Sequence, residues 1–429
     1  MKRWFWAFAL LLSLFIAKPS AAQQRFIVRT TLGLPGLQTV CLLDSCQVLR
    51  SLDGTVGQLF VLTTSDLVNP DAFLAVLRLT PGIADAEVDQ VLTIVSDLAN
   101  VATIPPGLSD NTQIDYFGSQ VWNGYANQPA ASIVRVPDAH TAFGVSGTGI
   151  VADIDTGVDP THPAFANILL PGYDFTRNQA GGSELPDYPF SPPAPCPSCP
   201  AANVNQSSAA ILDQSSAAIL DGGPYSAFGH GTMVVGVIHL VAPTALIMPL
   251  KSFQANGTGY LSDILRAIYY AVQNQANVIN MSFDFTSSST ELATAVNYAA
   301  QNDVICVASV GNDGAQELVY PAALANVMGV ASTSDLDTRS GFSNYGSDVW
   351  VAAPGEGIVT TYPFSTYAAG WGTSFSAPFV SGGASLLLSL NRNTNPTSAA
   401  QAMAHAKQLT PTLGNGRLDL YLALGSLGQ

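Results

Sequence analysis

From residue 149 onward, short apolar runs alternate with stretches whose apolar residues recur at helical spacing. The runs cover residues 150–154, 247–250, 278–281, 304–310 and 327–332. Because they lack polar alternation, they are typical of parallel strands that are buried on both faces. Between them, residues 261–272 and 292–299 each present one apolar helix face, and Ser288-x-x-Glu291 is a capping-box sequence ahead of the second. This alternation predicts an α/β fold with a doubly wound parallel sheet, in which functional residues gather beyond the carboxyl ends of the strands.

Residues 23–100 carry a different pattern, which is typical of a small α+β module. We expect strands at residues 25–29, 58–62 and 88–95, and helices at residues 37–49 and 70–79. In the second helix Phe73, Leu74 and Leu77 recur at helical spacing, and Asn69 is placed to cap its amino end. On this pattern alone, the module is a small accessory domain at the N-terminal side.

Residues 1–22 are predicted to be a signal peptide. Lys2 and Arg3 form a basic start, residues 4–17 are apolar apart from one serine, and residues 20–22 are small, so cleavage is expected before Gln23. The alternative is a permanent N-terminal anchor, for which the apolar run is short. We therefore expect a secreted protein, extracellular or periplasmic, that has no membrane contact in its mature form.

Two stretches lack a clear period. Residues 101–147 contain a Pro-Pro-Gly sequence and are expected to form a linker and an N-terminal extension of the main domain. Residues 171–224 are rich in proline and glycine and are predicted to be a long surface insertion. Within it, residues 206–213 recur letter for letter as residues 214–221, a duplication that an exposed loop tolerates. A gating role for the insertion is the alternative to a simple connection.

The composition excludes some partners. The formal net charge is −15, and no cluster of lysine and arginine follows residue 3. Because nucleic acids and anionic membranes attract basic patches, we expect neither as a partner.

The five cysteines are few for a secreted chain of this length. Cys196 and Cys199 are expected to form a local disulfide in an oxidising compartment. A zinc site is the alternative, but it would need a second ligand pair at matching spacing. Cys306 lies in an apolar run and is expected to be a small buried side chain.

Three short motifs contain the candidate chemistry. Asp155 stands in the sequence DIDTGVD, His230 in GHGT and Ser374 in GTSFSAP. A serine becomes a useful nucleophile when a histidine takes its proton and a carboxylate holds that histidine in the correct tautomer. His230 opens an apolar helix, and Ser374 opens another over residues 374–390, in which two glycines at 382 and 383 indicate tight packing.

These motifs, in the order Asp, His, Ser, resemble those of the subtilisin-like serine proteases, the subtilase family, over about residues 148–425. The resemblance implies a subtilisin-like catalytic domain at residues 148–429 and a serine endopeptidase that works through an acyl-enzyme. It implies catalytic roles for Asp155, His230 and Ser374. It also implies that Asn312, in the sequence ASVGNDG, stabilises the oxyanion together with the backbone N–H of the serine.

The resemblance further implies where a polypeptide substrate binds, as an added strand between two segments. The predicted substrate-binding residues are Asn280, Met281, Ser282, Phe283, Ser309, Val310 and Gly311. These residues carry no charge, so no charge-selective pocket is evident.

By the same resemblance, residues 23–100 are a propeptide that assists folding and inhibits the enzyme, which then processes itself between about residues 100 and 115. We expect a monomer that requires no cofactor. Calcium is common in the family, but no acidic ligand loop can be recognised in this chain.

Two other classes of function compete with a protease. A binding protein on a degenerate protease scaffold would be expected to lack Asp155, His230, Ser374 or Asn312, and all four are present. An esterase of the α/β-hydrolase type would need a Gly-x-Ser-x-Gly elbow and the order Ser, Asp, His, and the chain has neither. Because the base must be a neutral histidine, activity is expected to fall on acidification.

Overall fold

The computed structural model describes residues 24–65, 68–94, 105–188, 202–203 and 225–427. The predicted signal peptide, the Cys196–Cys199 pair and the eight-residue repeat lie outside these residues. The chain divides into two compact units, residues 1–51 with 58–88, and residues 52–57 with 89–429. No helix in the described part of the chain is long and apolar enough to span a membrane.

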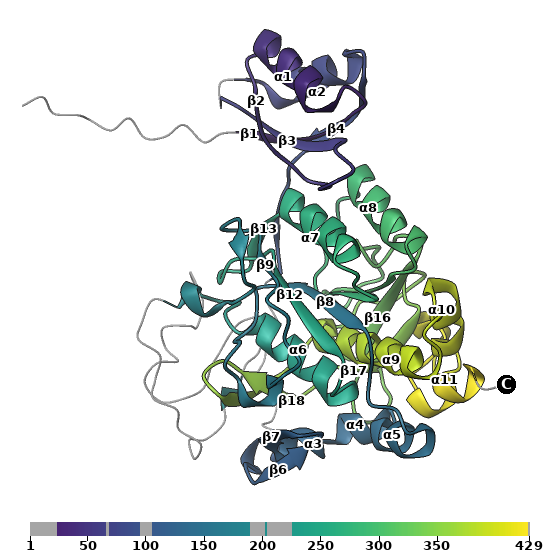
Figure 1. Ribbon diagram of the computed structural model, residues 1–429. Coiled ribbons are helices and arrows are strands. Elements are labelled where there is room, and N and C mark those ends of the chain that lie inside the picture. The colour runs from purple at the N-terminus through teal and green to yellow at the C-terminus, as the bar shows by residue number, and fades with distance from the viewer. Residues whose placement is uncertain (1–23, 66–67, 95–104, 189–201, 204–224, 428–429) are drawn as a thin grey trace, which may run out of the picture. The chain divides into compact units, whose positions relative to one another are not determined.

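The smaller unit is an antiparallel sheet in the order β2-β3-β1-β4, packed against two helices (Figure 1). Its elements are β1 (Gln24–Thr30), α1 (Gly33–Asp44), β2 (Gln47–Ser51), β3 (Leu59–Thr64), α2 (Pro70–Leu79) and β4 (Ile83–Val88). One core joins Phe26 and Phe60 of the sheet to Leu37 and Leu77 of the helices. The predicted helix at 70–79 is confirmed, and the Asn69 side chain accepts the Ala72 N–H at 3.0 Å.

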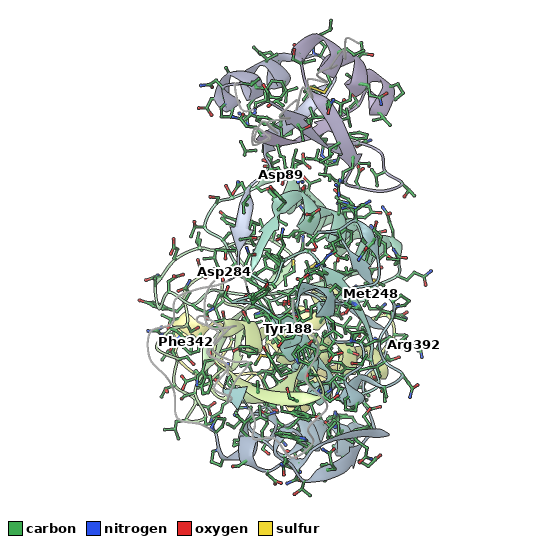
Figure 2. All side chains as sticks on the ribbon, turned by 90° about the vertical axis from the view of Figure 1, so that its left-hand side faces the viewer. Asp89, Tyr188, Met248, Asp284, Phe342 and Arg392 are labelled. Atoms are coloured by element: carbon green, nitrogen blue, oxygen red, sulfur yellow. A yellow bond between two sulfur atoms is a disulfide. The ribbon has the colours of Figure 1, made fainter. Side chains whose placement is uncertain are left out.

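The predicted helix at 37–49 is wrong at its carboxyl end. Helix α1 ends at Asp44, because Ser45 adopts the left-handed conformation and β2 begins two residues later. A disulfide joins Cys41 to Cys46 across this turn, visible as a yellow bond in Figure 2. The expected strand at 88–95 is correct only in part, since β4 ends at Val88 and a separate short strand, β5, covers Val91–Thr93.

The larger unit is built on a sheet in the order β10-β9-β12-β8-β14-β15-β16-β17. All neighbouring pairs from β9 to β17 are parallel, and β10 is antiparallel to β9. The strands are β8 (Ile150–Asp155), β9 (Tyr173–Asp174), β10 (Gln179–Ala180), β12 (Leu246–Lys251), β14 (Val278–Met281), β15 (Ile305–Ser309), β16 (Val327–Thr333) and β17 (Val351–Pro354). The chain runs from β8 to β12 on one side and then to β14 on the other, so β8 lies at the switch point where ligands bind in such sheets.

Helices cover both faces of this sheet (Figure 1). Helices α7 (Leu261–Gln273) and α8 (Thr290–Gln301) pack together over one face, and α6 (His230–Val241) and α9 (Ala377–Leu390) over the other. The α/β prediction is therefore confirmed.

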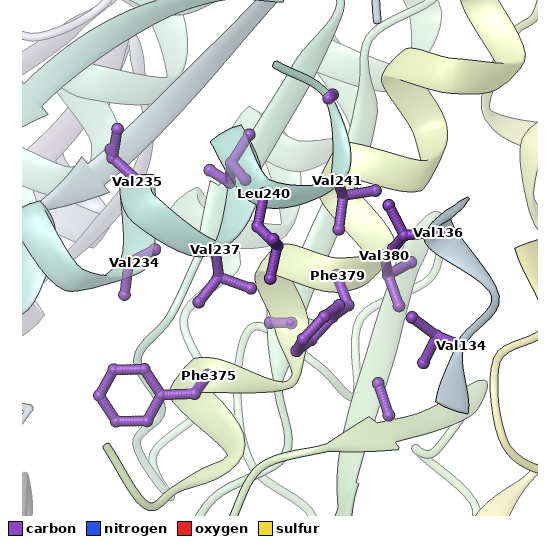
Figure 3. Packing of buried hydrophobic residues seen from close by; sticks show 14 of the residues in the cluster. Val134, Val136, Val234, Val235, Val237, Leu240, Val241, Phe375, Phe379 and Val380 are labelled. Atoms are coloured by element: carbon purple, nitrogen blue, oxygen red, sulfur yellow. The ribbon is translucent and has the colours of Figure 1, made fainter. Parts of the chain in front are cut away.

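Helices α6 and α9 lie in the main apolar core. Figure 3 shows Val237 and Val241 of α6 beside Phe379 and Val380 of α9. A Cβ atom on Gly382 would lie 2.6 Å from Cβ of Val241, so these two helices approach more closely than an alanine would allow. The tight packing expected of this glycine is confirmed.

Smaller elements complete the larger unit. They are β5 (Val91–Thr93), β6 (Gln113–Tyr116), β7 (Ser119–Trp122), α3 (Asn123–Ala126), α4 (Pro129–Ile133), α5 (Val136–Phe143), β11 (Ala202–Asn203), β13 (Thr258–Tyr260), β18 (Ile358–Tyr362), β19 (Thr366–Gly370), α10 (Pro396–Met403) and α11 (Leu420–Leu427). Strand β5 pairs antiparallel with β13, and just before it Asp89 accepts hydrogen bonds from the N–H and hydroxyl of Ser262, both at 2.8 Å. Within the larger unit, a short ribbon thus joins residues 89–93 to the start of α7.

Two local predictions in this unit need correction. The cap of α8 is Ser289, whose hydroxyl oxygen accepts the Leu292 N–H at 3.0 Å, and the predicted cap Ser288 is one residue too early. Ser374 does not begin the long helix either. It lies in a separate 3₁₀ turn (Thr373–Phe375), and α9 starts at Ala377.

Candidate active site

Asp155 and His230 are held together at the carboxyl edge of the sheet. Asp155 is the last residue of β8, and His230 is the first residue of α6. The Nδ1 atom of His230 lies 2.7 and 2.8 Å from the two carboxylate oxygens of Asp155. Both side chains are buried, so their hydrogen bond is shielded from solvent. This contact fixes the ring and leaves the Nε2 atom free to act on a third group.

The glycines next to His230 leave the space that this contact requires. A Cβ atom on Gly231 would lie 2.1 Å from the carbonyl oxygen of Gly157 and 3.2 Å from Cβ of Asp155. Gly229 has a φ of +91° and directly precedes α6. The small residues therefore let the loops that carry Asp155 and His230 approach each other closely.

A second aspartate stands next to the pair. Burial, and then the charge of Asp155, raise the pKa of Asp153 well above its ordinary value. Its Oδ1 atom accepts a hydrogen bond from Nδ2 of Asn280 at 2.9 Å. The neutral form of Asp153 is therefore favoured.

The 3₁₀ turn that contains Ser374 packs against the start of the His230 helix. The ring of Phe375, the following residue, is 6.0 Å from the His230 ring, centroid to centroid. The Ser374 hydroxyl donates to the carbonyl oxygen of Ser282 at 3.2 Å, and the Ser282 hydroxyl donates to the Ser374 carbonyl at 3.0 Å. The serine is thus anchored to the segment after β14 through both its hydroxyl and its carbonyl group.

Asn312 brings an amide group to the same place. Its Oδ1 atom accepts hydrogen bonds from the backbone N–H and the hydroxyl of Thr373, at 2.8 and 3.0 Å. The amide is therefore oriented with Nδ2 as the remaining donor. A Cβ atom on Gly372 would lie 3.7 Å from that Nδ2 and 3.8 Å from the backbone nitrogen of Ser374, so both donors border one small space.

The predicted substrate-binding residues fall into two groups. Asn280 and Met281 lie in β14 and Ser309 in β15, and both strands pair with a neighbour on each side. The Asn280 side chain is fully buried, where its Nδ2 donates to Ser282 and its Oδ1 accepts from Ser381. The other four predicted residues, Ser282, Phe283, Val310 and Gly311, follow the ends of these strands. Substrate contact stays a prediction for all seven.

An ionisable group beside the predicted binding segments escaped the sequence reasoning. Asp284, which is labelled in Figure 2, directly follows Phe283 in the sequence, and its Oδ2 would lie 2.9 Å from a Cβ atom on Gly311. Burial, and then the nearby Asp313 and Glu317, raise the pKa of Asp284 to about 7. The absence of a charge-selective pocket stays a prediction, and the position of Asp284 immediately after a predicted binding segment was the signal that could have identified this ionisable group.

Glu184 was also missed. It is fully buried beside the loops of Asp155 and His230, although it lies in the stretch predicted to be a surface insertion. Cys306 is buried and not disulfide-bonded, as expected, and burial raises its pKa to about 12. Among the described residues, no group of three or more histidine, cysteine, aspartate or glutamate side chains is arranged to hold a metal ion.

Comparison with known proteins agrees with this geometry. The sequence pattern of the subtilase family, Peptidase_S8, matches residues 147–421. The chain belongs to the subtilase family. It is a serine endopeptidase with a subtilisin-like fold.

Individual relatives support the assignment. Thermitase from Thermoactinomyces vulgaris is 33% identical over 68% of this chain and 93% of its own length. A thermophilic serine proteinase from Bacillus sp. (strain AK1) is 35% identical over 57% of this chain, and the match spans only 53% of that relative. The crystal structure of a cold-adapted subtilisin-like serine proteinase aligns with a TM-score of 0.52 at 28% identity, over 64% of this chain and 90% of the other.

Proposed function

We propose that this subtilase hydrolyses peptide bonds through Asp155, His230 and Ser374. The hydrogen bond between Asp155 and Nδ1 of His230 is the observation that carries the proposal. Ser374 attacks the scissile carbonyl carbon while His230 takes the hydroxyl proton at Nε2 and then gives it to the leaving amine. Asp155 keeps the proton on Nδ1 and stabilises the imidazolium. Water then hydrolyses the acyl-enzyme by the same route in reverse.

The negative charge that develops on the carbonyl oxygen needs donors. Nδ2 of Asn312 and the backbone N–H of Ser374 border the space into which this oxygen would move. Because Thr373 already holds the Asn312 amide, its orientation costs nothing when the reaction occurs. The proposed reaction uses only these groups and water, and a polypeptide is the substrate.

Covalent labelling tests the nucleophile directly. A fluorophosphonate probe should react with the active enzyme, and peptide mapping should place the adduct on Ser374. Labelling of a different serine, or of none, would contradict the proposal and favour a binding protein on a degenerate scaffold.

We further propose that the protein is secreted as a precursor, is monomeric, and is inhibited by residues 23–100 until it cuts itself. N-terminal sequencing of the secreted form should find a start between about residues 100 and 115. A Ser374→Ala precursor should retain the earlier residues, because it cannot make the cut. A secreted active enzyme that still begins at Gln23 would contradict the propeptide assignment.

Asp284 should make the enzyme respond to substrate charge in a pH-dependent way. We expect the ratio of kcat/KM for a peptide with lysine before the scissile bond to that for its uncharged norleucine analogue to rise about three- to tenfold from pH 6 to pH 8. Over this range Asp284 loses its proton, with a pKa of about 7, while lysine stays charged.

Asp284→Asn is the control for this effect, because asparagine keeps the size of the side chain and cannot ionise. In that variant the ratio should stay constant with pH. A wild-type ratio that is also constant would show that the Asp284 charge does not reach the substrate.

A further inference from the structure

Glu184 is a fully buried carboxyl group that the proposed mechanism does not use. It lies after the short strands β9 and β10, next to the 3₁₀ turn at Leu185–Asp187. Burying a carboxylate is costly unless hydrogen bonds compensate for the lost water. Its contacts therefore indicate what holds it there.

Three donors converge on Glu184. Its Oε2 atom accepts the backbone N–H of Gly229 at 2.7 Å and the hydroxyl of Thr156 at 3.1 Å. Its Oε1 atom accepts the hydroxyl of Thr232. Thr156 directly follows Asp155, whereas Gly229 and Thr232 flank His230. One side chain therefore bonds to both loops that present the Asp–His pair.

The two threonines extend this connection into the backbone. The Thr156 oxygen also accepts the N–H of Gly231 at 3.0 Å, and the Thr232 oxygen accepts the N–H of Asp159 at 2.8 Å. The first N–H groups of a helix have no partner within the helix, and negative charge is favourable there. Glu184 and Thr156 thus satisfy the start of α6 at the residues on either side of His230.

We propose that Glu184 is a positioning residue of the active site, whose carboxylate fixes the Asp155 loop against the first turn of the His230 helix. This inference rests on the proposed catalytic roles of Asp155, His230 and Ser374. Because Glu184 acts through its neighbours, its loss should reduce turnover and leave substrate binding unchanged.

The charges around Glu184 give this role a signature in the pH profile. Asp155 and Asp153 face it from β8 and Lys251 from β12, where the Lys251 side chain donates to the Thr156 carbonyl at 2.7 Å. Burial raises the pKa of Glu184 to about 8, against the hydrogen bonds from Thr232 and Gly229 and the charge of Lys251, and Asp155 adds to the rise. When Glu184 ionises, it becomes a full acceptor for all three donors and adds negative charge beside Asp155.

The wild-type enzyme should therefore gain activity in two steps as the pH rises. The first step accompanies deprotonation of the histidine base, and the second is centred at about pH 8. The test measures kcat and KM from pH 5 to pH 10 on an uncharged peptide, for the mature wild type and for Glu184→Gln. Glutamine keeps the size of the side chain and one acceptor oxygen but cannot ionise. We expect the variant to lose the upper step, with kcat at pH 9 reduced roughly tenfold and KM unchanged.

Two further variants separate this role from general damage. Asp174→Asn is the matched control, because Asp174 is also buried and accepts three hydrogen bonds, from Thr176 and twice from Arg177, but contacts neither catalytic loop. It should keep both steps. Thr156→Val removes the hydroxyl link while Glu184 keeps its charge, so it should lower kcat and retain the upper step.

The outcomes are distinct. A Glu184→Gln profile with the wild-type shape and kcat would overturn the proposal, and so would loss of the upper step in Asp174→Asn. If Glu184→Gln fails to fold or mature, Thr156→Val decides, and an unchanged kcat in that variant refutes the positioning role. Failure of the underlying mechanism would differ from all of these, because the wild type itself would then show no fluorophosphonate adduct on Ser374.

Discussion

Ser374→Ala should abolish peptide hydrolysis while the protein still folds. Alanine removes the hydroxyl that attacks the substrate, and the loss of the hydroxyl's single 3.2 Å hydrogen bond to Ser282 should cost little stability. We expect kcat to fall by roughly 10⁶, the magnitude measured when the catalytic serine of subtilisin is removed. The measurement is turnover of a peptide substrate by the variant and wild type.

The matched control for this substitution is Ser389→Ala. Ser389 lies near the end of α9, where its hydroxyl donates only to the Ser385 carbonyl, at 3.2 Å. It should leave turnover unchanged. Hydrolysis by Ser374→Ala at a rate near that of the wild type would mean that another group is the nucleophile.

Asn312→Ala should lower kcat by roughly 10²–10³ with little change in KM. This magnitude is the one known for the oxyanion-hole asparagine of subtilisin. The physical reason is that Nδ2 of Asn312 meets a charge that exists only during the reaction, so its loss affects the transition state and spares substrate binding. Steady-state kinetics on a peptide ester and a peptide amide measure both constants.

Asn312 also anchors Thr373, and a second variant separates the two roles. Thr373→Val keeps the backbone N–H that bonds to Asn312 and removes only the hydroxyl bond at 3.0 Å. Thr373→Val weakens the anchor but leaves the Asn312 amide in place, so its loss of activity reports only how far Asn312 is displaced. We expect it to lose less than about tenfold, because the backbone bond still orients the amide. An Asn312→Ala variant whose KM rises while kcat holds would contradict the oxyanion role.

Residues that belong to a short sequence motif could be singled out from the sequence. Asp155, His230 and Ser374 each stand among small residues with characteristic spacing, and the strand before Asp155 and the helix after His230 follow from apolar runs. Each of these signals is contained in a short stretch of chain around the residue concerned. The fold of the larger unit was predictable for the same reason, since each strand and helix carries its own pattern.

The groups that depend on contacts between distant residues were not predictable. Glu184 stands in a proline- and glycine-rich stretch, and only the folded chain brings it to Thr156 and Gly229. Asp284 lies beside Gly311, which is on a different loop, and this proximity exists only in the folded chain. Similarly, the helix at 37–49 was predicted too long because residues 47–51 form β2, which pairs with β3 on both sides of a register shift at Leu49, and this tertiary pairing overrides the local apolar pattern.

The pairing of β5 with β13 affects what would happen after the proposed self-cleavage. Strand β5 precedes the expected processing region and β13 follows it, and the Asp89–Ser262 bonds add to their pairing. Breaking one peptide bond between them leaves these hydrogen bonds in place. A nicked molecule would therefore show two fragments on a denaturing gel and a single particle on a sizing column. For an enzyme that cuts itself as proposed, cleavage and release would be separate events, and the lag before full activity would be set by dissociation of the ribbon, which warming accelerates.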